Sequence, residues 1–378
     1  MTDMIPFIDL QAQRGRIGAK IDAAVAKVLG EGRYILGPEV TQLEADLAAF
    51  NGEGRALSCA NGTDAILIPL MAWEIGPGDA VFVPSFTFAS TAEVVVLAGA
   101  SPVYVDIDPD TYNMSPASLA AAIDAVKAKG ELTPRAVIAV DLFGQPANYP
   151  ALNEITRAHG MKLIADGAQG FGCTLDGQSS LHWADVLTIS FYPAKPLGCY
   201  GDGGAVMCKD DALYDLMKSV RVHGEGKERY EYARIGLNSR LDTIQAAVLL
   251  EKLRVFREEI EMRQRVADRY AAGFGNQVKY PRVPDNAQST WAQYTIEVAD
   301  RDGFRAHLAA KGVPSAIYYP IPLHLHEPYA PYPLAPGGLP VTEAAAGRVV
   351  SLPMHPDMSD AHIDQVIEAV LSYPAAHA

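Results

Sequence analysis

Short apolar runs alternate with segments of helical periodicity through the first half of the chain, and this alternation constrains the fold. The apolar runs are AVFVP (80–84), PVYVD (102–106), AVIAVDLF (136–143), KLIAD (162–166), VLTISF (186–191) and GAVMC (204–208). Helical periodicity lies between most of them, at 63–73, 91–98, 115–128 and 149–159. Strands that alternate with helices form a largely parallel sheet covered on both faces. We therefore predict an α/β domain with three layers.

The pattern changes after residue 210. Ser239 and Asp242 have the spacing of a helix capping box, and the proline-free sequence that follows to about 274 predicts one long helix or a pair of helices. A smaller α+β unit is predicted beyond it, with a strand near 293–298, a helix across 302–311, an extended loop at 319–340 and a closing helix across 360–372. We expect a large domain at 1–250 and a smaller C-terminal α+β domain at 251–378.

Composition narrows the class of protein. The 378 residues are 49% hydrophobic and 20% charged, as in a soluble protein with substantial cores. The net charge of −14 opposes binding to nucleic acid or anionic lipid, and no apolar stretch is long enough to cross a bilayer. The start, MTDMIPFIDL, lacks the apolar run of a signal peptide, and the four cysteines show no CxxC spacing. We expect a cytoplasmic protein with reduced thiols and no membrane or nucleic-acid partner.

Lys195 has an unusual setting within SFYPAKPLGCYGDGGAV (190–206). Pro193 and Pro196 restrict the backbone on either side of it, and the glycine-rich run that follows lets main chain approach a bulky ligand closely. A lysine that forms a Schiff base must be neutral often enough to attack a carbonyl group, and it must reach one carbon atom. The setting suits a lysine that binds pyridoxal phosphate, although a lone lysine more often lies in a surface turn.

Asp166 and the segment CANGTDA (59–65) support the same interpretation. Asp166 ends the strand KLIAD, where an α/β sheet commonly presents ligand-binding groups, and a buried carboxylate there would keep a pyridine nitrogen protonated. It would otherwise cap the segment that follows. CANGTDA predicts a strand, a turn and a helix start, so the amides around Gly62, Thr63 and Asp64 could hold a phosphate. The alternative is a plain Asn-Gly turn with Thr63 as the helix cap.

Aromatic residues follow the predicted strand at 80–84. Phe86 and Phe88, in SFTFAS (85–90), could each stack on a planar ring, or they could simply pack in the core.

These segments together make the chain similar to the DegT-type sugar aminotransferases. Those enzymes have fold type I and use pyridoxal 5'-phosphate to aminate keto sugars carried on nucleotides. The resemblance runs from FIDL at 7 to SLPMHP at 351–356. Its specific parts are GRYILGPEV (32–40), CANGTDA, FTFASTAE (86–93), VDIDPDTYN (105–113), ADGAQGFG (165–172), SFYPAKPLGCYGDGGA (190–205) and GLNSRLDTIQAA (236–247).

The resemblance implies roles around the cofactor ring. Lys195 would bind the cofactor as a Schiff base and then carry a proton between the cofactor and the substrate. Asp166 would pair with the pyridinium nitrogen, and Gln169 would contact the 3-hydroxyl oxygen. Phe88 would stack on the ring.

The resemblance also implies roles around the cofactor phosphate. Gly62, Thr63 and Ser190 would hold the phosphate, and Asn238 would reach it from a second subunit. This implies a homodimer with shared active sites. Asn238 could also cap the helix that follows it.

The implied reaction takes an amino group from L-glutamate, releases 2-oxoglutarate and aminates a nucleotide-linked keto sugar for a surface polysaccharide such as O-antigen. Substrate contacts are expected from Arg240, Tyr318, Tyr319 and His324, where the chain is similar to members that aminate C3 of UDP-linked 3-keto-N-acetylglucosaminuronic acid. Those members carry His-Tyr before Pro-Ile-Pro, whereas this chain has Tyr318-Tyr319. A dTDP-linked 3-keto-6-deoxyhexose therefore remains the alternative substrate. Most other basic residues between 221 and 240 are expected in a solvated loop.

Other classes of function stay open at this point. His324 and His326 alternate on an extended segment and have no acidic or cysteine partners nearby in the sequence, so no metal site is expected. A dehydratase on this fold would lack Lys195. A sensor or scaffold would keep the cofactor pocket without turnover. An enzyme acting on free amino acids would need an arginine for the α-carboxylate, and Arg348 is the one candidate near the C-terminus.

Overall fold

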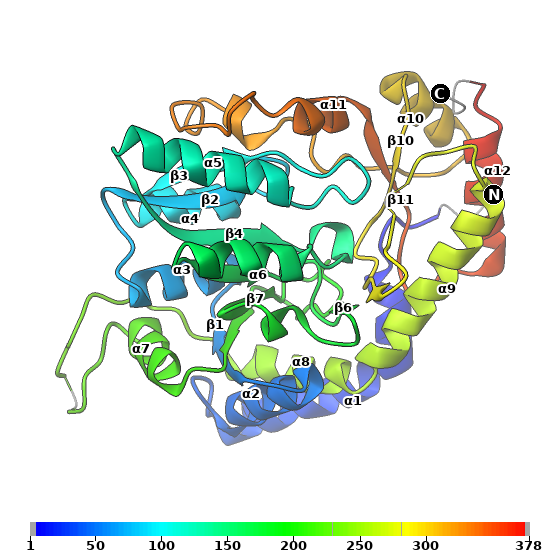
Figure 1. The fold of residues 1–378 in the computed structure, drawn as a ribbon. Coiled ribbons are helices and arrows are strands. Elements are labelled where there is room, and N and C mark those ends of the chain that lie inside the picture. The colour runs from blue at the N-terminus through cyan, green and yellow to red at the C-terminus, as the bar shows by residue number, and fades with distance from the viewer. Residues whose placement is uncertain (1–4, 229, 281, 375–378) are drawn as a thin grey trace.

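A seven-stranded sheet forms the centre of the chain, shown in Figure 1 as a computed structural model that describes residues 5–228, 230–280 and 282–374. Its strands are β1 (Arg55–Cys59), β2 (Asp79–Pro84), β3 (Ser101–Val105), β4 (Thr133–Val140), β5 (Lys162–Asp166), β7 (Val186–Ser190) and β8 (Gly204–Cys208). The order is β1-β8-β7-β5-β4-β2-β3. Only β8 pairs antiparallel, with β1 and with β7, within this sheet. The predicted, mostly parallel sheet is confirmed.

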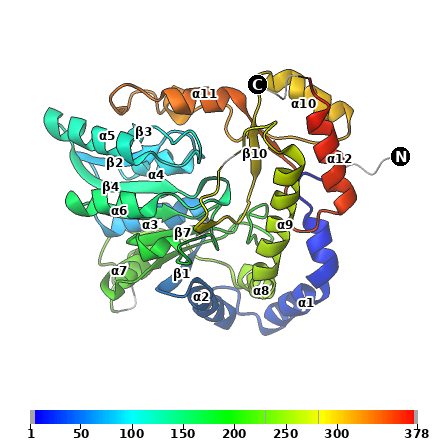
Figure 2. The same cartoon turned by 45° about the vertical axis from the view of Figure 1, so that its right-hand side comes forward.

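Helices cover both faces of this sheet, as predicted. On one face α3 (Gly62–Ala72) packs against α4 (Ser90–Leu97) and α7 (Asp211–Arg221), and on the other α5 (Pro116–Lys129) packs against α6 (Tyr149–Ala158) (Figures 1 and 2). Polar side chains cap the starts of α3, α5, α6 and α7. Asn61 accepts a hydrogen bond from the Asp64 amide at α3, and Asn148 caps α6 in the same way.

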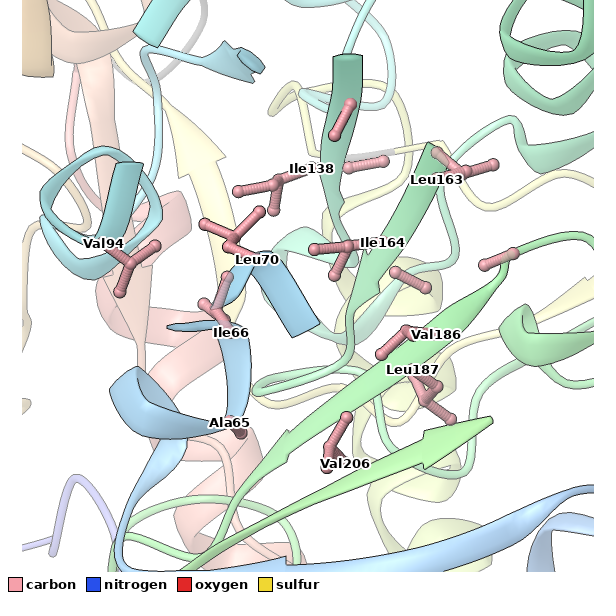
Figure 3. Close-up of a cluster of buried hydrophobic side chains, with 14 of the residues drawn as sticks. Ala65, Ile66, Leu70, Val94, Ile138, Leu163, Ile164, Val186, Leu187 and Val206 are labelled. Atoms are coloured by element: carbon pink, nitrogen blue, oxygen red, sulfur yellow. The ribbon is translucent and has the colours of Figure 1, made fainter. Parts of the chain in front are cut away.

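The core fills the space between the sheet and α3. Figure 3 shows Ile66 and Leu70 of α3 beside Ile138 of β4 and Ile164 of β5, and all four side chains are buried. Leu163 points to the opposite face from its neighbour Ile164, because successive side chains alternate along a strand. Both faces of the central strands are therefore apolar, which explains why these strands read as continuous apolar runs in the sequence.

A helix pair follows the sheet, α8 (Thr243–Leu253) and α9 (Phe256–Phe274). The predicted capping box is wrong. Asp242 occupies the N-cap of α8, while the Ser239 hydroxyl accepts a hydrogen bond from the Ala60 amide at 3.1 Å. Asn238 lies too far upstream to cap the helix, so that alternative is also wrong.

The C-terminal region has a core of its own. Strands β10 (Tyr294–Glu297) and β11 (Val349–Leu352) pair antiparallel, and α10 (Arg301–Ala310) and α12 (Asp360–Leu371) pack around them. The outer half of α9 joins this core and lies beside α12 (Figures 1 and 2), whereas Phe256 and Ile260 at its start pack in the large core. Packing thus changes from one core to the other within α9, and the domain boundary at 250 stays a prediction.

The sequence analysis did not identify several elements. These are α1 (Leu10–Glu31) and α2 (Pro38–Asn51), which pack on α8, as well as α7, α11 (Pro340–Arg348), and the short paired strands β6 (Thr174–Leu175) and β9 (Ala287–Gln288). Ile5, which precedes α1, is buried in the C-terminal core. Within the described ranges, no helix combines the length and the apolar character needed to cross a membrane.

Candidate active site

The candidate residues gather at the carboxyl edge of the sheet. Strands β1, β2, β4, β5 and β7 point the same way, so the loops that follow them meet at one edge, where α/β sheets bind ligands. The register places Cys59 and Ser190 on either side of Gly204. The segments after these strands carry the glycine of the CANGTDA turn, the two phenylalanines, the aspartate and the lysine.

Lys195 and Asp166 are the two titratable groups at the centre of the site, and each affects the charge of the other. Asp166 is buried, and its carboxylate accepts a hydrogen bond from the Ala168 amide at 3.1 Å. Burial raises the pKa of Asp166, while the Ala168 amide and the charge of Lys195 act in the opposite direction. Burial lowers the pKa of Lys195, although the charge of Asp166 opposes the change. The amine is therefore neutral more often than that of a surface lysine.

Gln169 is held in one orientation. Its Oε1 accepts a hydrogen bond from the Phe143 amide at 2.7 Å, and its Nε2 donates to the Tyr319 hydroxyl at 3.0 Å. Its main-chain oxygen accepts a hydrogen bond from the Thr290 hydroxyl at 2.9 Å. An amide nitrogen carries two protons, so a second donor remains on Nε2 for a ligand oxygen.

The structure separates the two candidate phenylalanines. Phe86 is 1% exposed, in a cluster with Tyr112 and Phe143. Phe88 is 57% exposed, and its ring centroid lies 6.4 Å from that of Tyr319. Phe86 therefore belongs to the core, and Phe88 is the ring available for stacking.

The predicted phosphate residues lie together at the start of α3. A Cβ atom on Gly62 would lie 2.6 Å from the Cβ of Ser190, so glycine is required for this approach. The Asp64 amide is already bonded to the Asn61 side chain, which leaves the amides of Gly62 and Thr63 as the donors of this helix N-terminus.

The glycines after Lys195 were expected to let main chain approach a ligand, but two of them instead allow close contacts within the protein. A Cβ atom on Gly198 would lie 2.5 Å from the Pro193 oxygen, and one on Gly204 would lie 2.4 Å from the Asn61 oxygen. At these positions the glycines let the chain fold closely onto itself, and this packing fixes the turn that carries Lys195.

The remaining candidates divide into two places. Asn238 is exposed and accepts a hydrogen bond from Arg240 at 2.6 Å, next to Ser239, which contacts the turn at Ala60. Tyr318 precedes Tyr319 and lies 6.4 Å from the ring of Phe7, measured between centroids. Tyr318 belongs to the loop that carries Tyr319 into the site.

His324 is committed to protein contacts. Its Nδ1 shares a hydrogen bond with the Ser85 hydroxyl at 2.7 Å, and its Nε2 lies 3.3 Å from Oε1 of Glu343. No group of three or more potential metal-ligating side chains occurs in the described ranges.

One basic residue and one acidic residue differ from expectation. Arg221, assigned to a solvated loop by its neighbours, is buried and pairs with Glu44 at 2.8 Å. Asp141 was missed, although it directly follows β4 and lies at the same edge as Asp166. The rule that drew attention to Asp166, a carboxylate at the end of a buried strand, would have found it.

Comparison with known proteins identifies relatives over almost the whole chain. Residues 16–371 match the DegT/DnrJ/EryC1/StrS aminotransferase family. The UDP-2-acetamido-2-deoxy-3-oxo-D-glucuronate aminotransferase of Pseudomonas aeruginosa is 48% identical over 374 residues, which cover 97% of this chain and 99% of that one. The dTDP-3-amino-3,4,6-trideoxy-alpha-D-glucose transaminase of Streptomyces venezuelae is 36% identical over 373 residues, with 98% and 96% covered.

Solved structures of similar proteins superpose on this chain over most of its length. An aminotransferase from Brucella abortus superposes with a TM-score of 0.95 at 53% identity, covering 97% of this chain and 98% of the other. NtdA from Bacillus subtilis, solved with the cofactor PMP bound, superposes with a TM-score of 0.85 at 26% identity, covering 98% and 85%.

Proposed function

The chain belongs to the DegT/DnrJ/EryC1/StrS aminotransferase family, and from this premise we propose that it transfers an amino group from L-glutamate to C3 of UDP-2-acetamido-3-keto-glucuronic acid. The product would serve the assembly of a surface polysaccharide such as O-antigen. The observation that carries the choice of substrate is the 48% identity, over 97% of the chain, with the Pseudomonas aeruginosa enzyme of that name.

The residues at the carboxyl edge fit pyridoxal 5'-phosphate, the cofactor of this family. An exposed aromatic ring at Phe88, a buried carboxylate at Asp166 and a partly buried amine at Lys195 match a flat, cationic ring that bears an aldehyde. The two amide donors at the start of α3, with the Ser190 hydroxyl beside them, match a phosphate. When bound, the cofactor supplies the carbonyl group and the electron-accepting ring that transamination needs.

Each side chain then has a defined task. Lys195 acts as the general base, because its lowered pKa leaves Nζ free to take a proton from the donor amino acid and return it to the sugar. Asp166, ionised, would keep a proton on the ring nitrogen. Gln169 and Tyr319, joined by their hydrogen bond, would hold the edge of the ring that carries the hydroxyl oxygen. Phe88 would cover one face of the ring and exclude water from it.

The site is proposed to be shared between two subunits of a homodimer. The loop between α7 and α8 projects from the body of the protein (Figure 1), and it carries exposed Asn238 and, near it, Tyr232 and the 84% exposed Ile235. Ile35, also exposed, lies next to Asp242. An apolar surface of this kind around a candidate cofactor residue supports contact with a second copy.

Subunit mixing tests this arrangement. Lys195→Ala and Asn238→Ala subunits are each expected to be nearly inactive alone. An equimolar, randomly paired mixture would regain about a quarter of the wild-type activity, because about half of its dimers are mixed and each mixed dimer has one site with both native residues. Absence of recovery would place Asn238 in its own chain's site.

Arg240 is proposed to bind the carboxylate of the sugar, since arginine pairs with carboxylates through two parallel hydrogen bonds. A dTDP-linked 3-keto-6-deoxyhexose lacks this carboxylate and remains the alternative, supported by the Streptomyces venezuelae relative. Tyr318 and His324 are proposed to shape the sugar pocket. The four free, buried cysteines support a reducing compartment such as the cytoplasm.

The test is a visible absorption spectrum of the protein with pyridoxal phosphate, before and after L-glutamate, followed by product analysis with each keto sugar. We expect absorption from the cofactor bound to Lys195, its loss on addition of glutamate, and turnover of the uronic acid. A spectrum that does not respond to any amino donor would favour the sensor or scaffold alternative. Faster turnover of the 6-deoxy sugar would reassign the substrate.

A further inference from the structure

A buried carboxyl group beside the site has no task in the function proposed above. Asp141 follows β4, is 0% exposed, and accepts four hydrogen bonds. The Tyr149 hydroxyl at 2.6 Å and the Ala147 amide at 3.0 Å donate to Oδ1. The Ser180 hydroxyl at 2.9 Å and the Cys173 thiol at 3.6 Å donate to Oδ2. Within the described ranges, no lysine or arginine bonds to this carboxylate.

The four donors come from three separate segments. Ala147 and Tyr149 stand at the start of α6, Cys173 lies in the turn after β5, and Ser180 begins the short 3-10 helix η2 (Ser180–His182). The Asp141 carboxylate therefore ties together three stretches of chain next to the end of β4.

Asp141 also contacts the segment that carries the cofactor residues. Its amide donates a hydrogen bond to the Asp166 oxygen at 3.0 Å, and a Cβ atom on Gly170 would lie 2.3 Å from the Asp141 Cβ. Two residues further on, the Phe143 amide holds Gln169. A shift of Asp141 would thus move Asp166 and Gln169 together.

We propose that Asp141 is a positioning residue whose ionised carboxylate fixes residues 166–173, so that Asp166 and Gln169 face the cofactor ring. The ionised form suits the geometry, because an ionised carboxylate only accepts hydrogen bonds and four donors are directed at its two oxygens. This inference rests on the proposed function, since the ring it serves is the cofactor of that reaction.

Burial opposes ionisation of the Asp141 carboxyl group, and the hydrogen bonds that it accepts favour ionisation. Burial raises the pKa of Asp141 to about 6, the nearby charge of Asp166 acts in the same direction, and the donated hydrogen bonds oppose it. Asp166, Tyr149 and Cys173 are the titratable groups that face it. Asp141 is therefore expected to be ionised at pH 8 and neutral at pH 5, which gives the proposal a distinctive test.

The test compares wild type with Asp141→Asn, which keeps the shape and removes the charge. The measurements are the dissociation constant for pyridoxal phosphate, at pH 8 and pH 5, and the turnover with glutamate and the keto sugar. At pH 8 we expect about 10- to 100-fold weaker cofactor binding and a similar loss of kcat, because a small misplacement of reacting groups has effects of this size. KM for the sugar should stay within about twofold, because Asp141 does not touch it.

The dissociation constant of Asp141→Asn divided by that of wild type should fall toward one at pH 5, where the wild-type carboxyl group is itself neutral. A ratio that is the same at both pH values would show that only packing matters and would overturn the proposal. So would wild-type cofactor affinity and turnover in a folded Asp141→Asn protein. Wild-type protein that fails to bind the cofactor or use glutamate would instead refute the proposed function.

Two further variants complete the design. Ser180→Ala removes one donor and keeps the charge, so it should change cofactor affinity by less than about threefold. If Asp141→Asn does not fold, Tyr149→Phe removes the shortest bond to the carboxylate and should weaken cofactor binding by more than Ser180→Ala does. Equal affinity in wild type and Tyr149→Phe would then overturn the proposal.

Discussion

Phe88→Ala should separate cofactor binding from folding. Phe88 is 57% exposed, so removal of its ring should change the free energy of unfolding by less than about 0.5 kcal/mol. Covering the ring with a cofactor would bury the exposed half, worth about 1 kcal/mol, and stacking adds about 0.5–1.5 kcal/mol. The variant should therefore bind pyridoxal phosphate about 10- to 100-fold more weakly.

Phe86 is the matched control, two residues earlier on the same segment. It is 1% exposed and packed among aromatic rings, so Phe86→Ala should lower the free energy of unfolding by about 3–5 kcal/mol. Urea unfolding of the cofactor-free proteins and fluorescence titration with the cofactor measure the two quantities. The reasoning fails if Phe88→Ala is destabilised by more than about 1 kcal/mol or binds the cofactor like wild type.

Four other outcomes are expected. Lys195→Ala should abolish turnover with an unchanged circular dichroism spectrum, and residual amination would refute its role. Arg240→Ala should raise KM for the uronic acid far more than for a neutral 6-deoxy sugar, whereas an equal loss would assign Arg240 to the diphosphate or cofactor. Arg221→Met should cost about 3 kcal/mol of unfolding free energy, because it leaves the Glu44 charge partly buried without its partner, and Glu44→Gln in the same chain should restore part of it. The raised pKa of Asp141, about 6 against an ordinary 3.8, means that ionisation of this group removes about 2 kcal/mol from the free energy of unfolding as the pH rises from 4 to 7. Asp141→Asn lacks this contribution, so the difference in urea stability between wild type and the variant should change by about that amount, and an equal difference at both pH values would contradict this.

The sheet was predictable because its strands carry their own signal. KLIAD and VLTISF are apolar on both faces. A short apolar run of this kind between two helical segments predicts a parallel strand that is buried on both sides. The helix start at α3 was predictable for a similar reason, since its Asn-Gly turn and its cap are local features.

Features that depend on distant contacts were not predictable in the same way. Ser239 looked like a helix cap, but its hydroxyl bonds to Ala60, which is far away in the sequence. Arg221 looked solvated because its neighbours are charged, yet Glu44 draws it into the interior. The choice between Phe86 and Phe88 also needed the structure, because the sequence does not show which ring the aromatic cluster buries.

The position of Ile5 has a consequence for synthesis of the protein. Ile5 belongs to the same buried cluster as Val350 and Leu352 of β11, and the Met354 amide donates to the Phe7 oxygen at 3.3 Å. Translation proceeds at about 5–20 residues per second, so Ile5 leaves the ribosome tens of seconds before its partners do. The C-terminal core therefore cannot close until nearly all of the chain has been made, whereas the large sheet, complete by Cys208, can form earlier.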